Sequence, residues 1–133
     1  MSNEPWNIHF FQDRRGEVPA LQFFDAVPIQ VVAEFKATLD AVAEAPPPTF
    51  SGGGKWEAMH GDMSGLFEAR VGHASMNHRL FCVLDRNAND LGGPSIVVLD
   101  GLSKPKRTAA AIRDYSRILN MKGEFLETRS VLR

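Results

Sequence analysis

The chain reads GLFEAR at residues 65–70, HRLFCVL at 78–84 and SIVVLDG at 95–101, and it continues into KPKRT at 104–108. The first three runs are short and apolar, which is typical of strands. The connections between them, residues 72–77 and 86–93, are short enough for antiparallel hairpins or a meander. We therefore predict three consecutive strands, with one arginine on each of the first two and a cationic segment after the third.

Alternation along these strands assigns each side chain to one of two faces. In the first run Phe67, Ala69 and Val71 share one face, and Leu66, Glu68 and Arg70 share the other. In the second run Leu80, Cys82 and Leu84 lie opposite Arg79, Phe81 and Val83. The third run is apolar on both faces, which is typical of a strand inside the sheet. Correct pairing of the first two strands would place Arg70 and Arg79 on the same face.

The rest of the chain supplies one more strand and three helices. Residues 6–11 alternate as a strand, Pro19 suits the first turn of a short helix to Ala26, and a longer helix follows Pro28. That longer helix has an apolar stripe of Val31, Phe35, Leu39 and Val42, and prolines 46–48 end it. Residues 50–65 are predicted as a loop, and Thr108 is predicted to cap a last helix through Asn120.

The predicted order is strand, helix, helix, strand, strand, strand, helix. This is an α+β fold with a mainly antiparallel sheet packed by helices. A length of 133 residues fits one domain over residues 1–133, with a core at about 6–120 and a C-terminal extension at 121–133. The extension is polar, and whether it docks, pairs or frays stays open.

Composition excludes several classes of protein. Apolar residues make up 44% and charged residues 23%, as in globular domains, and no apolar run approaches the roughly 18 residues of a membrane span. Residues 1–6 are polar and lack a secretory apolar segment, so we expect a cytoplasmic protein. The single cysteine, Cys82, cannot form an intramolecular disulfide and is predicted as a buried structural thiol.

The sequence offers no pattern for a metal or a cofactor. No two histidines have the i, i+4 spacing of a helical zinc pair, and Cys82 has no partner cysteine. Glycines 52–54 are followed by no Gly-Lys-Ser/Thr ending, so a flexible connection is favoured over a nucleotide site. We therefore expect neither.

Charge is unevenly distributed although the net charge is only −1. Residues 1–50 hold three basic and seven acidic side chains, whereas the chain from Lys104 onward holds eight basic and three acidic ones. This asymmetry predicts an acidic and a basic face, the alternative being a mixed solvated surface.

A rigid sheet that presents cations suits a phosphate-bearing ligand, and RNA in particular. Metal-free RNA cleavage needs a base for the 2′-OH proton, cations for the charge on the phosphorane, and an acid for the leaving 5′-oxygen. Arg70 and Arg79 are the main candidates for the cations because a guanidinium binds phosphate oxygens in pairs. The alternative is a structural ion pair with Glu68 or Asp85.

Several other residues could take part in the same chemistry, and a purely structural role is the alternative for some of them. Lys104, Lys106 and Arg107 could close the site or form a solvated turn, and His78 could be acid or base although alternation points it to the other face. His60 and His73 could reach RNA from loops. Lys55 with Trp56 could offer a cation and a stacking surface, or a core tryptophan beside a solvated lysine.

Three blocks, in order and spacing, resemble the RelE/ParE toxin superfamily, and most closely its HigB-like, phage-derived branch. GLFEAR at 65–70 resembles the family's Gly-Leu-aromatic-Glu-Leu-Arg strand, and HRLFCV at 78–83 its Tyr-Arg-hydrophobic-aromatic strand. VVLDGLSKPKRT at 97–108 is similar to its hydrophobic strand that runs into Gly-Phe-x-Lys-Lys-Thr, with Leu102 in place of the aromatic and Pro105 between the lysines.

The resemblance implies a RelE-like fold and a toxin of a type II toxin–antitoxin system, paired with a small antitoxin, often of helix-turn-helix type. It implies a messenger-RNA endonuclease that acts in the ribosomal A site without a metal. Two alternatives stay open on the same fold: a gyrase-directed or other protein-binding toxin without nuclease activity, and a non-toxic phage-derived binding or regulatory module.

Overall fold

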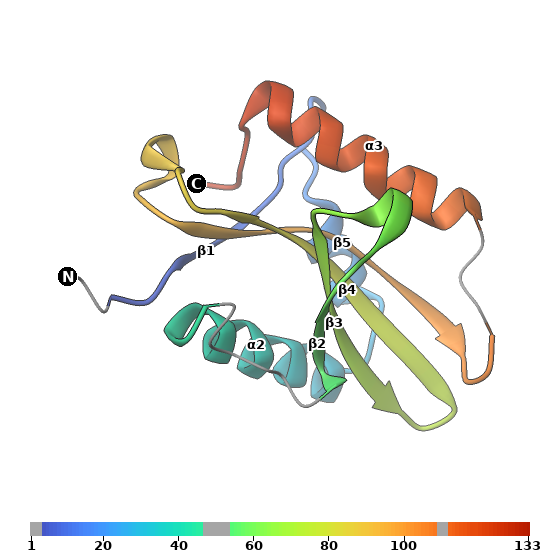
Figure 1. Cartoon of the computed structure of the whole chain (residues 1–133). Coiled ribbons are helices and arrows are strands. Elements are labelled where there is room, and N and C mark those ends of the chain that lie inside the picture. Colours follow the sequence, from blue (N-terminus) through green and yellow to red (C-terminus); the bar gives the residue numbers. More distant parts are fainter. Residues whose placement is uncertain (1–3, 47–53, 109–111) are drawn as a thin grey trace.

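A computed structural model describes residues 4–46, 54–108 and 112–133. The molecule has three layers: one five-stranded sheet, helix α3 on one of its faces, and helices α1 and α2 on the other (Figure 1). The elements in chain order are β1 (Asn7–Phe10), α1 (Pro19–Asp25), α2 (Ile29–Glu44), β2 (Trp56–Ala58), η2 (Gly61–Met63), β3 (Leu66–His73), β4 (Met76–Asp85), η3 (Asn89–Leu91), β5 (Ser95–Pro105) and α3 (Ile112–Thr128). The α+β class with a mainly antiparallel sheet is as predicted.

The strand order in the sheet is β1-β5-β4-β3-β2. β1 runs parallel to β5, and the other neighbours are antiparallel. β5 is an interior strand, as its apolar faces predicted. β2 is an addition, because residues 56–58 lie in the stretch that was predicted as a loop.

The two faces of the sheet bury separate apolar clusters, as alternation predicted. The face under α3 buries Leu66, Phe81, Val83, Leu102, Ile118 and Phe125, among others. The face under α1 and α2 buries Ala69, Val71, Leu80, Cys82 and the predicted α2 stripe of Val31, Phe35, Leu39 and Val42. Cys82 is fully buried, and burial raises the pKa of its thiol, as expected for a structural cysteine.

A β-bulge in β5 decides which residues of its second half face α3. Val98 pairs with Cys82 and Asp100 with Phe81, so Leu99 is an extra residue in the ladder. Leu99 and Asp100 therefore break the alternation, and Leu102 and Lys104 lie on the same face as Arg79. Strict alternation from Ser95 would have put them on the opposite face.

The C-terminal residues extend α3 and then dock on β1. α3 continues to Thr128 instead of ending at Asn120, and the chain then forms a bridge between Phe11 and Val131. The N–H of Leu132 donates to the carbonyl of Phe10 at 2.8 Å, which ties this end to the sheet edge. The predicted cap at Thr108 precedes residues 109–111, which lie outside the described ranges. No helix within those ranges is long and apolar enough to cross a membrane.

Candidate functional site

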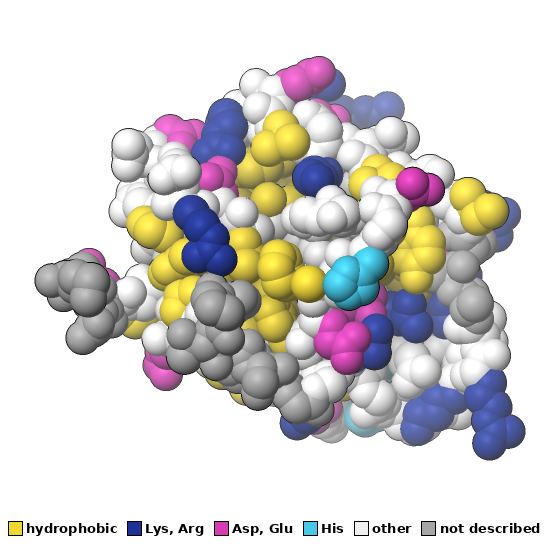
Figure 2. All heavy atoms as spheres, viewed as in Figure 1, with side chains coloured by type: hydrophobic (Ala, Val, Ile, Leu, Met, Phe, Trp, Pro, Cys, Tyr) yellow, Lys and Arg dark blue, Asp and Glu magenta, His cyan; other side chains and the backbone are white. Residues whose placement is uncertain are grey.

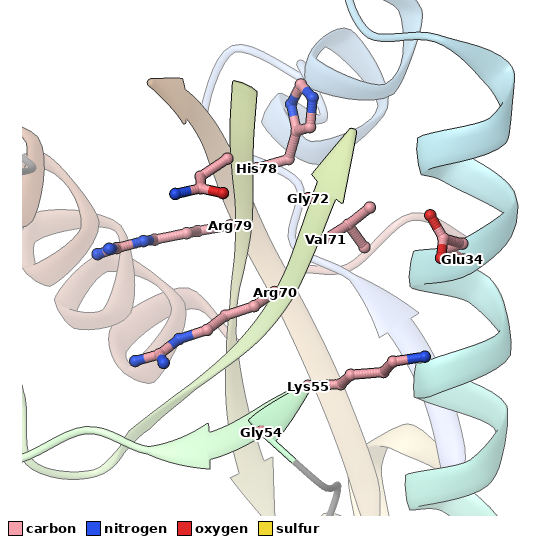
Figure 3. Close-up of a pocket in the computed structure, with 9 residues that line it drawn as sticks. Glu34, Gly54, Lys55, Arg70, Val71, Gly72, His78 and Arg79 are labelled. Carbon is pink, nitrogen blue, oxygen red and sulfur yellow. The ribbon is translucent and has the colours of Figure 1, made fainter. Parts of the chain in front are cut away.

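Arg70 and Arg79 lie directly opposite each other on β3 and β4. Directly paired residues on antiparallel strands project to the same face, so this register brings the two guanidinium groups together. Both extend side by side toward α3 (Figure 3). Their side chains are 45% and 26% exposed, so both can be reached by a ligand. The predicted juxtaposition of Arg70 and Arg79 is present.

A buried carboxylate, Glu68, holds the two arginines together. Nε of Arg70 donates to its Oε1 at 2.5 Å, and Nη1 of Arg79 lies 3.9 Å from its Oε2. Glu57 on β2 adds a second carboxylate to Arg70 at 3.2 Å. Burial alone would lower the pKa of Arg70, but the hydrogen bond and charge of Glu68, with the charge of Glu57, outweigh it and raise that pKa above its ordinary value. Arg70 therefore forms the ion pair with Glu68 that was the structural alternative, and part of its guanidinium group is still exposed.

Tyr115 of α3 completes the arrangement around Arg79. Nη1 of Arg79 donates to the Tyr115 hydroxyl at 3.0 Å, and the Tyr115 ring packs edge-on against Phe81, with 6.3 Å between ring centroids. Tyr115 is half-buried, with its ring packed on the core and its hydroxyl at the site.

These side chains border one cavity of about 290 Å³ on the α3 face. It is lined by Glu57, Ala58, Met59, His60, Met63, Glu68, Arg70, Arg79 and Tyr115. His60, which was predicted to reach RNA from a loop, is exposed and precedes the short η2 helix at the wall of this cavity. The cavity thus combines two cations, two carboxylates, an imidazole and a phenol, which are groups suited to proton transfer near a phosphate.

Two further cations lie on the same face. Lys104 is the last lysine within β5, and its Nζ pairs with Asp114 of α3 at 3.3 Å. Lys106 follows the strand, and a Cβ atom built on Gly72 would lie 3.9 Å from its Cε, so the lysine side chain lies beside Gly72 of β3.

The cationic surface continues at the tip of the sheet. Arg107 is exposed there, at a positive φ of 70°. Figure 2 shows Lys and Arg side chains gathered over the end of the sheet where the hairpins turn. The lysines and Arg107 form an open extension of the arginine pair rather than a wall of its cavity.

The side chains of His78 and His73 lie on the opposite face of the sheet from the two guanidinium groups. His78 is only 4% exposed and lies on the α2 face, where its Nδ1 is 2.6 Å from the Ser103 hydroxyl. Burial, and next the charge of His73, lower its pKa. His73 is at the end of β3, three residues from Arg70, and alternation puts it on the His78 face. The sheet therefore separates both imidazoles from the cavity under α3, and neither lines it as a direct acid or base there would.

Lys55 and Trp56 are also turned away. Lys55 extends toward Glu34 of α2, opposite to the arginines (Figure 3). A second hollow, of about 430 Å³, lies at the edge of β3. It is bordered by Lys55 and Glu34, together with Arg70, Arg79 and His78. Trp56 is 3% exposed and stacks on Phe67, with 5.4 Å between ring centroids. The core alternative is therefore correct for Trp56, which offers no free face for a base.

The positions of Glu68 and Tyr115 in the site were not predicted from the sequence. Glu68 is two residues before Arg70, so alternation already placed it on the arginine face, but it was considered only as an ion-pair partner. The other proposed partner, Asp85, pairs with Arg129 instead, at 2.5 Å. Tyr115 carried no local signal, because its contact with Arg79 depends on how α3 crosses the sheet.

No group of three or more His, Cys, Asp or Glu side chains that could hold a metal ion is found in the described part of the chain.

Comparison with known proteins gives a likeness of fold. The sequence matches no protein-family model and no curated protein. The structure matches a chain in the crystal structure of the toxin–antitoxin complex RelBE2 from Mycobacterium tuberculosis, with a TM-score of 0.51 and 16% sequence identity. The match covers 75% of this chain and 99% of that chain. At this identity the finding establishes a shared fold.

Proposed function

We propose that the protein is the toxin of a type II toxin–antitoxin system and that it cleaves messenger RNA on the ribosome. The observation that carries this proposal is the pair of guanidinium groups, Arg70 and Arg79, converging from adjacent strands on one cavity. Two planar cations fixed by a sheet suit a phosphodiester, whose charge grows in the transition state of cleavage.

The reaction is an attack of the ribose 2′-oxygen on the neighbouring phosphorus. A bond forms between O2′ and phosphorus, the bond from phosphorus to O5′ breaks, and the products are a 2′,3′-cyclic phosphate and a 5′-hydroxyl. Arg70 and Arg79 stabilise the charge on the phosphorane. Lys106 and Arg107 extend the cationic surface along the RNA backbone, and Lys104 supports it beside Asp114.

The shared fold with a chain of a toxin–antitoxin complex supports the toxin part of the proposal. The three sequence blocks at residues 65–70, 78–83 and 97–108 support assignment to the HigB-like branch. The partners that follow are a cognate antitoxin, of helix-turn-helix type in this branch, and the ribosome with its messenger.

Controlled expression in bacteria, with growth and transcript 5′-ends as readouts, tests the proposal. Wild-type protein is expected to stop growth and to leave codon-phased cuts. Arg70→Ala and Arg79→Ala are each expected to restore growth and to slow cleavage by about 100-fold, because each removes one preorganised charge from the transition state.

Arg15→Ala is the matched control, since it also deletes one exposed arginine, but in the connection between β1 and α1. It should remain as toxic as wild type. Thermal melting of the purified variants establishes that they are folded. Growth arrest without RNA cuts would refute nuclease activity and favour a gyrase-directed or other protein-binding toxin, and normal growth with folded wild-type protein would refute the toxin assignment.

A further inference from the structure

We propose that Glu68 is the proton acceptor of the cleavage reaction, so that Oε2 of this carboxylate takes the proton from the ribose 2′-hydroxyl. The inference rests on the proposed function and adds to it the identity of the base. It is carried by a buried acceptor atom beside the cavity, and by the position of that atom between the two arginines.

Oε2 of Glu68 lacks a hydrogen-bond partner among the described residues, although the side chain is only 3% exposed. An unsatisfied buried acceptor costs about 1–3 kcal/mol, so such atoms are rare and invite explanation. The other oxygen, Oε1, is fully engaged by Nε of Arg70 at 2.5 Å. The carboxylate is thus held by one oxygen, while the other is buried without a hydrogen-bond partner in a side chain that lines the cavity. A ligand that enters the cavity would supply the missing donor.

The neighbours of this oxygen determine which ligand group suits it. Nη1 of Arg79 lies 3.9 Å away, beyond hydrogen-bonding distance, and Arg70 is bound to the same carboxylate. A phosphate held by these guanidinium groups would bring its adjacent ribose to Glu68. The 2′-hydroxyl is the donor on that ribose, and DNA has none, so the pairing would also distinguish RNA from DNA.

The proposed proton movements balance. As O2′ bonds to phosphorus, its proton moves to Oε2 of Glu68. As the bond from phosphorus to O5′ breaks, O5′ takes a proton from the imidazolium of His60, which lines the same cavity. Glu68 then returns its proton to solvent, and His60 is protonated again from solvent. No metal, oxidant or other co-reactant is required.

Other charged and titratable groups around Glu68 are less suited to the role of base. Arg70 and Arg79 are donors only. Glu57 of β2 lines the cavity, but its side chain is 47% exposed on the edge strand and pairs with Arg70. Tyr115 of α3 accepts the hydrogen bond from Arg79. Glu68 alone among these groups combines burial, rigid attachment and a free acceptor oxygen.

The test compares purified wild-type protein, Glu68→Gln and Glu57→Gln on translating ribosomes across a range of pH, with cleavage rate and product ends as readouts. Glu68→Gln keeps the size and an acceptor oxygen but cannot take the proton. It is expected to slow cleavage by about 100-fold or more, within the usual contribution of a general base. The cleavage rate of the wild-type protein is expected to fall on acidification; Glu68→Gln should abolish that fall, and Glu57→Gln should keep it.

Three outcomes separate this inference from the function on which it rests. Loss of rate with an unchanged acidic limb in folded Glu68→Gln would overturn the base assignment and leave Glu68 as a positioning residue for the arginines. Full activity of Glu68→Gln would overturn it outright. Absence of cyclic-phosphate ends with wild-type protein would instead refute the proposed function itself. If Glu68→Gln does not fold, Glu68→Asp provides the test: the base assignment requires it to keep the acidic limb at a lower rate, and loss of that limb would overturn the assignment.

Discussion

The buried imidazole of His78 makes the free energy of unfolding depend on pH. It is buried between β4 and β5 against Ser103, and burial, followed by the charge of His73, lowers its pKa below the ordinary 6.5. Below about pH 6.5 the unfolded chain takes up a proton that the folded protein resists, so the free energy of unfolding should fall as pH decreases through that value. Above it, both states hold a neutral ring and this contribution no longer changes with pH.

His78→Gln, which retains a hydrogen-bonding group for Ser103, should remove this part of the pH dependence. Urea denaturation of both proteins between about pH 5 and 8 measures it. When the free energy of unfolding is plotted against pH, the wild-type value should fall toward that of the variant at low pH, because only the wild-type protein loses the contribution of the neutral imidazole. Curves that stay parallel over the whole range would show that His78 is not held neutral by burial.

At the same scale, local alternation predicted the orientation of His78, and alternation together with the antiparallel pairing of β3 and β4 predicted the arginine pair. The contact between the Tyr115 hydroxyl and Arg79 was not predictable in this way, and for Trp56 the sequence offered a core position and a stacking surface as alternatives. Each depends on which distant element covers the residue: α3 for Tyr115 and the apolar face under α2 for Trp56.

Among the elements, α1 is fixed to the sheet through Gly101 of β5. A Cβ atom at Gly101 would lie 2.3 Å from Cδ2 of Phe23 in α1, so the ring rests directly on the strand backbone. Gly101→Ala should displace α1 and lower the free energy of unfolding by about 1–3 kcal/mol, as overpacking does. Chemical denaturation measures the change.

Gly123 in α3 is the control for the same substitution. A Cβ atom there would meet nothing within 4 Å, and alanine is the better helix former. Gly123→Ala should therefore raise the free energy of unfolding by up to about 1 kcal/mol. Equal effects of the two substitutions would contradict the close packing of α1 on β5.

The best-predicted elements were those whose apolar pattern repeats over several turns, such as α2 with its stripe of buried side chains. β2 was missed because it has only three residues and follows a glycine-rich stretch. The end of α3 was placed too early because Gly123 and its polar neighbours interrupt the apolar pattern, whereas Phe125 secures that turn against the core.

For the whole molecule, a net charge of −1 means that the RNA binding proposed above has to come from local cations. Each phosphate contact adds about −0.7 to the slope of log affinity against log salt for a single strand. Lys106→Gln should therefore weaken binding of a single-stranded RNA and make that slope shallower by about 0.7. Fluorescence anisotropy over a salt series measures both.

Lys36→Gln on α2 is the counterpart on the other side of the sheet, beside an apolar hollow that includes Phe24 and Leu39. It should leave the slope unchanged. If both lysine variants reduce the slope equally, RNA binding is spread over the molecule, and the cationic end of the sheet has no special part in it.

The extra residue at Leu99 has a consequence for how this protein can change over evolution. Beyond that point the orientation of every side chain in β5 depends on the number of residues before it. Substitutions there alter one contact at a time. Loss of a single residue would turn the rest of the strand over, moving Lys104 away from α3 and sending Ser103 out of reach of His78. In this segment chain length should be under stricter selection than residue identity.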